Sequence, residues 1–190
     1  MTLLGLSNIR EASLFPSDPK RIAGNRLKAK LFFGGESIRN EIMRLAKEQE
    51  YPFEHFVHEP TPTSADSARV RGSSREEGVK ALILRGKNSK KNYQFNICSH
   101  LKLDMKAVAE LVGEKCEFES PEVIQERFGL MIGGVPPFGN LLNLDTFFDT
   151  RILEAPRAVF NCGLVTESMG LQTQHLVELV QPKVALFARE

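Results

Sequence analysis

The clearest helical pattern in the chain runs from Ser37 to Glu50. Apolar residues recur there at the spacing of one helix face, at Ile38, Ile42, Leu45 and Ala46. Ser37 can cap the first turn with its hydroxyl, and Pro52 prevents the helix from continuing. The pattern therefore predicts an amphipathic helix over 37–50, followed by a strand over residues 53–58.

Capping residues predict the next helices. Asp104 precedes an apolar pattern that ends at Gly113, and Ser120-Pro121 supplies an N-cap and a proline at the first helical position. The helix that begins there should end at Gly129, because glycine readily adopts the left-handed conformation that closes a helix. Two shorter helices are expected over residues 63–72 and 174–180.

Short apolar runs bounded by turn residues predict the strands. They cover residues 79–85, 92–98, 115–118, 141–144, 157–162, 169–173 and 183–188. The first two form a hairpin around Gly86, and the helices and strands alternate irregularly. We therefore expect an α+β fold, a single domain with a mixed, mostly antiparallel sheet curled into a partial barrel and surrounded by helices. Residues 1–36 show weak periodicity and are interpreted as an N-terminal extension to a domain over 37–190.

Length and composition suit one globular domain, since the chain has 190 residues of which 42% are hydrophobic. The most apolar region, residues 128–144, is interrupted by glycines and prolines, so no membrane span is predicted. The first residues lack the basic segment of a secretion signal. We expect a cytoplasmic protein.

The charge is unevenly distributed along the chain. Residues 1–102 carry 18 Lys and Arg against 11 Asp and Glu, whereas residues 103–190 carry 7 against 13. Basic residues gather over residues 20–30 and over residues 85–91. Each cluster alone is equally typical of a solvated loop, but together they favour a nucleic acid partner.

Several common chemistries have no support in the sequence. The three cysteines are far apart and form no CxxC pair, and the four histidines share no ligand spacing. The chain contains no dinucleotide-binding glycine fingerprint, Walker A loop, HExxH or GxSxG motif. We expect reduced thiols and a protein that needs neither a metal nor a cofactor.

The most distinctive motif is the run from Gly133 to Gly139. Its paired glycines and paired prolines cannot continue a helix or a central strand, so they specify a shaped loop. Such a loop can present backbone N–H groups to an oxygen-rich ligand. Glycine and proline content by itself is also typical of a purely structural turn.

Lys80 is the second unusual residue. It interrupts the apolar strand Val79–Arg85, where both faces are otherwise hydrophobic. A lysine in that position either extends past the strand end to solvent or projects into a polar cavity. The strand alone leaves both possibilities open.

The order of these elements resembles the YbaK/ProX family of aminoacyl-tRNA editing deacylases, which are related to the insertion domain of bacterial prolyl-tRNA synthetase. The resemblance rests on the segments 59–64, 78–84, 120–122, 133–139 and 160–163 and extends from about Ser37 to about Pro182. It implies a single α+β domain that hydrolyses the ester joining a wrong amino acid to the terminal adenosine of a tRNA. It also implies that the substrate's 2′-hydroxyl and an ordered water do the chemistry, without a covalent nucleophile or a metal.

The resemblance assigns roles to individual positions. Lys80 matches the strand lysine that holds the 3′ end of the substrate, and Gly133–Pro137 matches the GxxxP loop whose amides position the ester. Asn161 and Gly163 match a strand end that reads Ser-x-Gly in several members, so Asn161 departs from the pattern. Catalytic roles are expected for Lys80, Gly133, Gly134 and Pro137. Substrate contacts are expected from Thr63, Ser64, Val135, Pro136, Phe138, Gly139, Asn161 and Gly163.

The sequence thus predicts a trans-acting aminoacyl-tRNA deacylase whose partner is the 3′ acceptor end of a mischarged tRNA. The alternative is a non-catalytic module of the same fold that binds tRNA or an aminoacyl-tRNA synthetase, and hydrolysis of another acyl ester is a third possibility. The sequence leaves open the amino acid that is removed, the tRNA, the oligomeric state and the role of residues 1–36.

Overall fold

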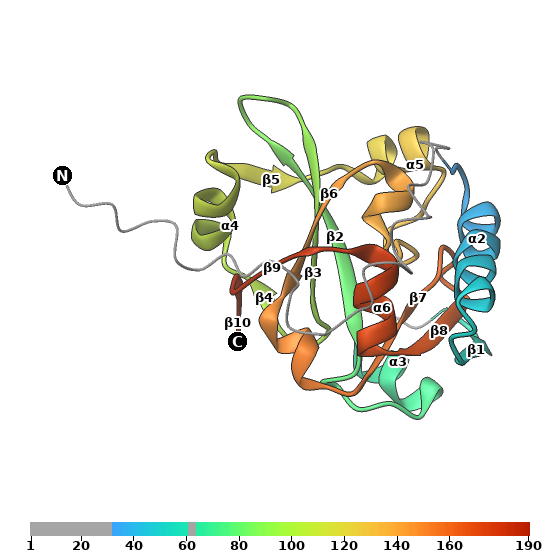
Figure 1. Cartoon of the computed structure of the whole chain (residues 1–190). Helices are drawn as coiled ribbons and strands as arrows, with labels where there is room; N and C mark the ends of the chain where they lie inside the picture. Colours follow the sequence, from blue (N-terminus) through green and yellow to red (C-terminus); the bar gives the residue numbers. More distant parts are fainter. Residues whose placement is uncertain (1–31, 61–63) are drawn as a thin grey trace.

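A computed structural model describes residues 32–60 and 64–190 of the chain (Figure 1). Its central sheet has five strands in the order β5-β2-β3-β6-β9. These are β5 (Cys116–Phe118), β2 (Val79–Gly86), β3 (Asn92–Cys98), β6 (Asp145–Asp149) and β9 (Lys183–Ala185). Strands β2 and β3 form the predicted antiparallel hairpin, in which Lys80 lies opposite Ile97. The sheet is mixed, because β6 runs parallel to both β3 and β9.

A second sheet lies beside the first. It contains β1 (Phe53–Val57), β8 (Glu167–Gln172) and β7 (Arg157–Asn161), all antiparallel. A parallel bridge between Gly78 and Val159 joins it to the start of β2, and the Val159 N–H donates to the Glu77 carbonyl at 2.8 Å. A two-stranded ribbon of β4 (Lys102–Leu103) and β10 (Ala188–Arg189) completes the strands of the described residues.

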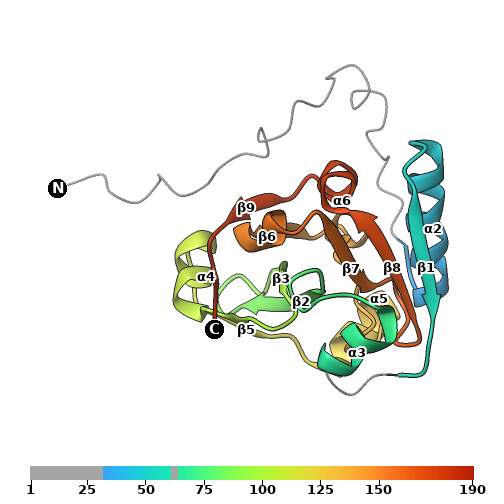
Figure 2. The same ribbon diagram turned by 90° about the horizontal axis from the view of Figure 1, so that it is seen from below.

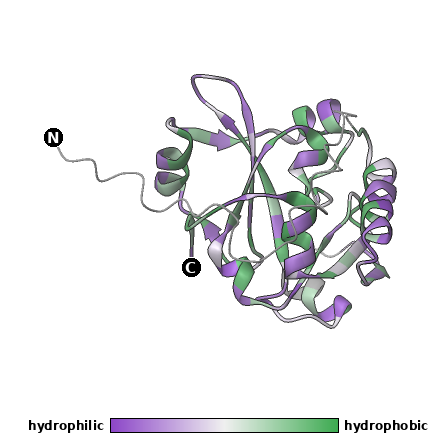
Figure 3. Ribbon diagram, in the orientation of Figure 1, coloured by the Kyte–Doolittle hydropathy of each residue, from purple (hydrophilic) through white to green (hydrophobic). Residues whose placement is uncertain are grey.

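Helices surround these sheets (Figure 2). They are α2 (Gly35–Glu48), α3 (Ser64–Arg71), α4 (Met105–Val112), α5 (Pro121–Phe128) and α6 (Thr173–Val180), with 3-10 turns η1 (Gly139–Leu142) and η2 (Thr150–Glu154). Helix α2 lies beside β1 in both views and buries the four apolar residues of its predicted face. Figure 3 shows hydrophilic residues on the outward side of this helix, as the period of 3.6 requires.

Aromatic side chains pack together in the core on the five-stranded sheet and on the segment that follows β9. The fully buried Phe95 stacks on Phe147 with ring centroids 4.7 Å apart and meets the edge of Phe187 at 5.0 Å. Such offset and edge-to-face pairs add to the stabilisation from burial. The predicted fold class, an α+β domain with a mixed, mostly antiparallel sheet arrangement, is confirmed; the described strands form no closed barrel.

The predicted caps of two helices are confirmed. The Asp104 carboxylate accepts hydrogen bonds from the N–H groups of Lys106 and Ala107 at the start of α4. The Ser120 hydroxyl accepts from Val123 at the start of α5, and Pro121 takes the first helical position. Each helix then ends at a glycine in the left-handed conformation.

Three predictions about local structure are wrong. Helix α2 begins at Gly35 with Gly34 as its N-cap, and no side chain caps it, so Ser37 lies inside the helix. The apolar run over 141–144 is not a strand, because η1 occupies it and Asn143 turns the backbone into the left-handed region; the strand follows as β6. The last predicted strand splits in two, since the Asp149 carboxylate accepts from the N–H groups of Phe187 and Ala188.

The two basic clusters of the sequence differ in what the structure shows of them. The segment over residues 20–30 lies outside the described residues. Of the N-terminal extension over 1–36, the structure describes only residues 32–36. The cluster at 85–91 forms the turn between β2 and β3, where Arg85 pairs with Glu117 at 2.6 Å and Lys91 with Asp145 at 2.6 Å. These acidic partners reduce its positive charge.

Within the described ranges, the helices are too short or too polar to cross a membrane.

Candidate functional site

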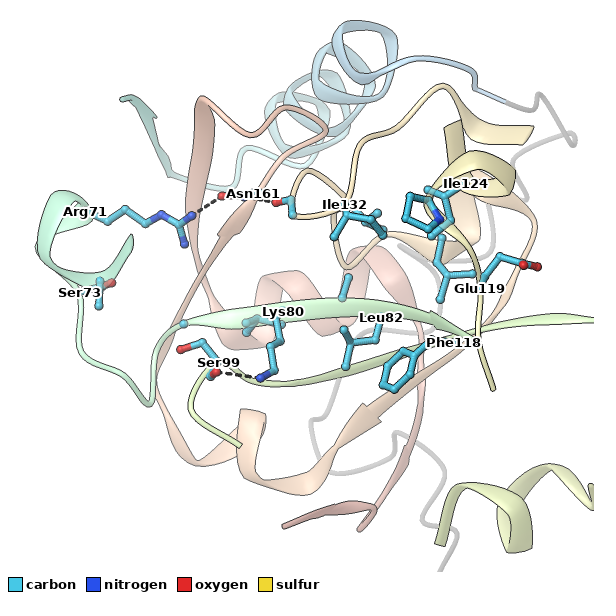
Figure 4. Close-up of a pocket in the computed structure, with 18 residues that line it drawn as sticks. Arg71, Ser73, Lys80, Leu82, Ser99, Phe118, Glu119, Ile124, Ile132 and Asn161 are labelled. Atoms are coloured by element: carbon cyan, nitrogen blue, oxygen red, sulfur yellow. Dashed lines mark hydrogen bonds between the residues drawn. The ribbon is translucent and has the colours of Figure 1, made fainter. Parts of the chain in front are cut away.

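A cavity of about 470 Å³ opens along β2 (Figure 4). The first half of β2 forms its floor, the end of α3 closes one side, and the start of α5 closes the other. The loop over 132–135 and the end of β7 complete the wall. The cavity therefore lies where the two sheets meet, and elements distant in the sequence surround it.

Lys80 lines this cavity from the beginning of β2. Its side chain is half-buried, and its Nζ donates a hydrogen bond to the Ser99 carbonyl at 3.0 Å. Burial, and to a smaller extent the nearby Lys102, lowers the pKa of the ammonium group. An ammonium has three N–H bonds, so groups other than Ser99 are needed to satisfy the rest. Of the two possibilities that the sequence left open, the structure favours projection into a cavity.

The glycine-proline loop reaches the cavity only through its first half. Gly133 and Val135 line it, whereas Gly134 is buried behind them and donates its N–H to the Met131 carbonyl at 2.9 Å. In the described part of the chain, the N–H groups of Gly133 and Val135 meet no acceptor. Neither amide is therefore committed to an intramolecular hydrogen bond among the described residues.

The second half of the loop fixes the first half to the core. The Gln94 side chain, fully buried on β3, donates to the Pro136 carbonyl at 2.9 Å. Phe138 is fully buried and packs against Phe160 with ring centroids 5.7 Å apart. Pro137 and Gly139 are also buried and lie outside the cavity wall. In the structure this half of the loop makes core contacts and does not line the cavity, and its predicted substrate contacts stay predictions.

Asn161 connects the loop to the opposite wall. Its Oδ1 accepts hydrogen bonds from Arg71 Nη2 and, at 3.0 Å, from Ser168 Oγ, and its Nδ2 donates to the Gly133 carbonyl. Because a guanidinium only donates, Oδ1 must face Arg71, which fixes the orientation of the amide. His58 Nε2 extends the network, 2.7 Å from Ser168 Oγ. A serine at position 161 could not reach both sides in this way.

Gly163 has a structural place in this arrangement. Its φ of +115° is one that other residues rarely adopt, and an added Cβ would lie 2.4 Å from the Gly35 carbonyl oxygen. The Gly163 carbonyl oxygen in turn would lie 3.1 Å from a Cβ on Gly134. The three glycines let the start of α2, the end of β7 and the loop approach closely.

The structure therefore brings together part of the predicted site. Lys80, Gly133, Val135 and Asn161 surround one cavity. Gly134, Pro136, Pro137, Phe138, Gly139 and Gly163 support its wall from behind. Thr63 lies outside the described residues, and Ser64 begins α3 with a side chain that is not described.

Sequence reasoning missed several polar residues of the site, namely Arg71, Ser73, Ser99 and Glu119 on the cavity wall and Gln94 and Ser168 behind it. Arg71 lines the cavity from the last position of α3, Gln94 holds the loop, and Ser168 supports Asn161. Lys80 stands out as a charged residue inside an apolar strand, but Gln94 does not, because Asn92, Gln94 and Asn96 alternate with apolar residues as in any strand with one polar face. Arg71 has no such signal, because an arginine near a helix end is typical of a solvated residue.

One cluster has the composition of a metal site. His55, Cys162 and Glu167 place their donor atoms within 4.8 Å of one another. Both oxygens of Glu167 already have a partner, because Arg39 lies 2.6 Å from one and His55 2.7 Å from the other. Burial, the largest effect, together with the charge of Glu167, raises the pKa of Cys162 to about 12, which opposes the thiolate a metal needs. We interpret the cluster as an ion-pair network beside a buried thiol.

Comparisons with known proteins agree with this architecture. The chain is similar to the Multifunctional Ser/Thr-tRNA deacylase ProXp-y of Escherichia coli strain K12, with 24% identity over 159 residues that cover 82% of this chain and 95% of the relative. The crystal structure of the hypothetical protein APE2540 superimposes with a TM-score of 0.70 at 24% identity, covering 78% of this chain and 99% of that one. A candidate trans-editing enzyme for prolyl tRNA synthetase gives a TM-score of 0.69 at 23% identity, covering 80% and 97%. The family model described as the aminoacyl-tRNA editing domain matches residues 58–179, so the chain belongs to the aminoacyl-tRNA editing domain family.

Proposed function

We propose that this chain is a trans-acting aminoacyl-tRNA deacylase, which hydrolyses the ester between a wrongly attached amino acid and the terminal adenosine of a tRNA. One observation carries the proposal. In a member of the editing domain family, a single cavity gathers Lys80, the amides of Gly133 and Val135, and the Asn161 side chain. The similarity to a Ser/Thr-tRNA deacylase supports the same activity.

The amides of the loop fit the main chemical requirement of this reaction. An aminoacyl ester is already activated, so its hydrolysis needs an oriented water and a place for the negative charge that develops on the carbonyl oxygen. The N–H groups of Gly133 and Val135 would supply that place, and each pre-oriented donor of this kind is worth roughly 10²-fold to 10³-fold in rate. Gln94 and Asn161 hold the loop on both sides, so the donors need no reorganisation when the charge appears.

Lys80 would hold an oxygen of the 3′ end. Its ammonium uses one N–H bond on the Ser99 carbonyl, which leaves the others for the substrate. The lowered pKa indicates that the charge is poorly solvated without a ligand, so an oxygen-rich substrate would relieve this cost. We assign the lysine to substrate positioning and to electrostatic stabilisation of the reacting ester.

A water molecule is the nucleophile in this proposal. Burial raises the pKa of all three thiols, to about 11 for Cys98 and about 12 for Cys162, so they remain protonated at neutral pH. None of them lines the cavity. The attacking water would be oriented by the loop and by the hydroxyl of the substrate's own ribose.

A panel of mischarged tRNAs tests the proposal. The name of the relative puts seryl- and threonyl-tRNA first, and alanyl-, prolyl- and cysteinyl-tRNA complete the set. We expect faster release of at least one amino acid than without protein, and loss of that acceleration in Asn161→Ala. The matched control is Arg69→Gln, because Arg69 is exposed on α3 and does not line the cavity. If the tRNAs bind while every ester keeps its uncatalysed half-life, the chain is a binding module.

A further inference from the structure

Arg71 is the most deeply buried cation on the cavity wall. The residue is only 8% exposed, yet no ion pair in the described part of the chain includes it. Burial lowers the pKa of its guanidinium to about 10, so the group remains charged at neutral pH. A buried charge without a counter-charge is costly, and such charges are usually paired or bind a ligand.

Hydrogen bonding leaves this guanidinium incompletely satisfied. Its Nη2 donates to Asn161 Oδ1, but its Nε is buried and meets no acceptor among the described residues. Ser73, two positions further along the chain, also lines the cavity and has a buried hydroxyl in the same condition. Figure 4 shows both side chains at the α3 end of the cavity. A polar ligand at this end of the cavity would satisfy both groups.

We propose that Arg71 and Ser73 form a subsite for the phosphate group of the terminal nucleotide of the tRNA. The proposal rests on the proposed function, and it names the part of the substrate that occupies this end of the cavity. A guanidinium matches the geometry and charge of phosphate oxygens, and a hydroxyl adds one further donor.

The chemistry of the substrate favours phosphate over its other groups. The ester carbonyl is neutral until the water attacks, so it would leave the buried guanidinium uncompensated in the bound ground state. The α-amino group of the amino acid is positively charged and would be repelled. The phosphate carries a full negative charge before, during and after the reaction.

The position of the subsite also fits the covalent structure of the 3′ end. In the terminal nucleotide, the aminoacyl ester and the phosphate are attached to the same ribose. In the protein, Asn161 bonds both to Arg71 and to the Gly133 carbonyl of the loop that would hold the ester. One residue therefore links the two subsites in the protein, as one ribose links the two groups in the substrate.

The test compares the binding of two small molecules that differ only in the phosphate. Adenosine 5′-monophosphate and adenosine are titrated calorimetrically into the full-length wild type, Arg71→Gln, Arg71→Lys, Ser73→Ala and the control Arg69→Gln. We expect the wild type and the control to prefer the monophosphate by about 10-fold or more, as one charge-assisted contact provides. Arg71→Gln should reduce this preference to about 2-fold or less with adenosine affinity unchanged, and Ser73→Ala should reduce it partly. Thermal unfolding verifies that each variant is folded, and Arg71→Lys keeps the charge if the glutamine variant does not fold.

The results separate this inference from the proposed function. A wild type that binds both molecules equally, or binds neither at millimolar concentration, overturns the phosphate subsite. An Arg71→Gln variant that keeps the preference but turns over more slowly also overturns it, because the arginine then acts on the ester. If the preference depends on Arg71 while no mischarged tRNA is hydrolysed, the phosphate subsite stands and the deacylase assignment fails.

Discussion

Replacing Lys80 by Met removes the ammonium group and keeps a flexible side chain of similar length. In the folded protein the ammonium donates to the Ser99 carbonyl at 3.0 Å, and a hydrogen bond to a charged group contributes about 1.5–3 kcal/mol. The lowered pKa indicates an opposing cost of burying the charge. We therefore expect the free energy of unfolding to change by only about 1 kcal/mol, which corresponds to a shift of roughly 2–4 °C in Tm for a chain of this size.

The expected effect on activity is much larger. If the ammonium contacts the substrate near the reacting ester, its loss should lower kcat/KM by about 10²-fold or more. The assay follows release of the amino acid from the best substrate of the panel, in parallel with thermal unfolding of both proteins. A variant that loses several kcal/mol of stability but keeps its turnover would show that Lys80 is a structural residue, and the reasoning would be refuted.

The pH dependence of the wild type provides a second readout of Lys80. Burial lowers the pKa of Lys80 below its ordinary value of 10.5. The side chain is therefore fully protonated at low pH and loses its proton as the pH rises through the lowered pKa. Activity that depends on the charge should fall in that same range, after subtraction of spontaneous ester hydrolysis. The cost of burying the charge lowers the free energy of unfolding while Lys80 is protonated. That free energy should therefore rise as the pH increases from the pKa of Lys80 in the folded protein to its higher pKa in the unfolded chain. The Lys80→Met variant should lack both trends.

Three further predictions concern structural residues. Gly163→Ala should lower the free energy of unfolding by about 2–4 kcal/mol, since it combines a strained φ with a collision against the Gly35 carbonyl; unchanged denaturant unfolding would contradict this. Asp149→Ala should lower the free energy of unfolding by about 3 kcal/mol or more, because the fully buried carboxylate accepts three backbone N–H bonds. Urea unfolding measures this difference, and an unchanged midpoint would contradict it. All thiols should react with Ellman's reagent much more slowly in the native protein than in the unfolded one at pH 8, given their burial and raised pKa values; one fast native thiol would be inconsistent with the structure. These thiols are Cys98, Cys116 and Cys162.

Local signals in the sequence predict most elements of the fold. They succeed where a single residue, such as a helix cap, determines where an element begins or ends. Asp104 and Ser120 cap helices because their short side chains reach the free backbone N–H groups of the first helical turn. The run over 141–144 predicts a strand wrongly, because leucines pack equally well from a strand and from a 3-10 turn. What decides there is Asn143 in the left-handed region, which asparagine adopts more readily than most residues but does not impose.

The candidate site was only partly predictable for a related reason. Lys80 and Gly133 stand out because a lysine in an apolar strand and paired glycines are rare in themselves. The support of the site depends on contacts between distant elements, such as Gln94 with the Pro136 carbonyl and Arg71 with Asn161. Neither partner of such a pair signals the other, so the pairs become visible only when the elements are placed in space.

The most direct measurement of the central claim is a progress curve of mischarged tRNA hydrolysis with the tRNA in large excess over the protein. We predict many turnovers per protein molecule and a rate about 10³-fold or more above that of the uncatalysed ester, because two amides without an intramolecular acceptor among the described residues and one ammonium belong to residues that line the cavity. A control reaction with Asn161→Ala excludes a contaminating hydrolase. Saturable tRNA binding with no release of amino acid beyond the uncatalysed rate, for every tRNA of the panel, would contradict the claim.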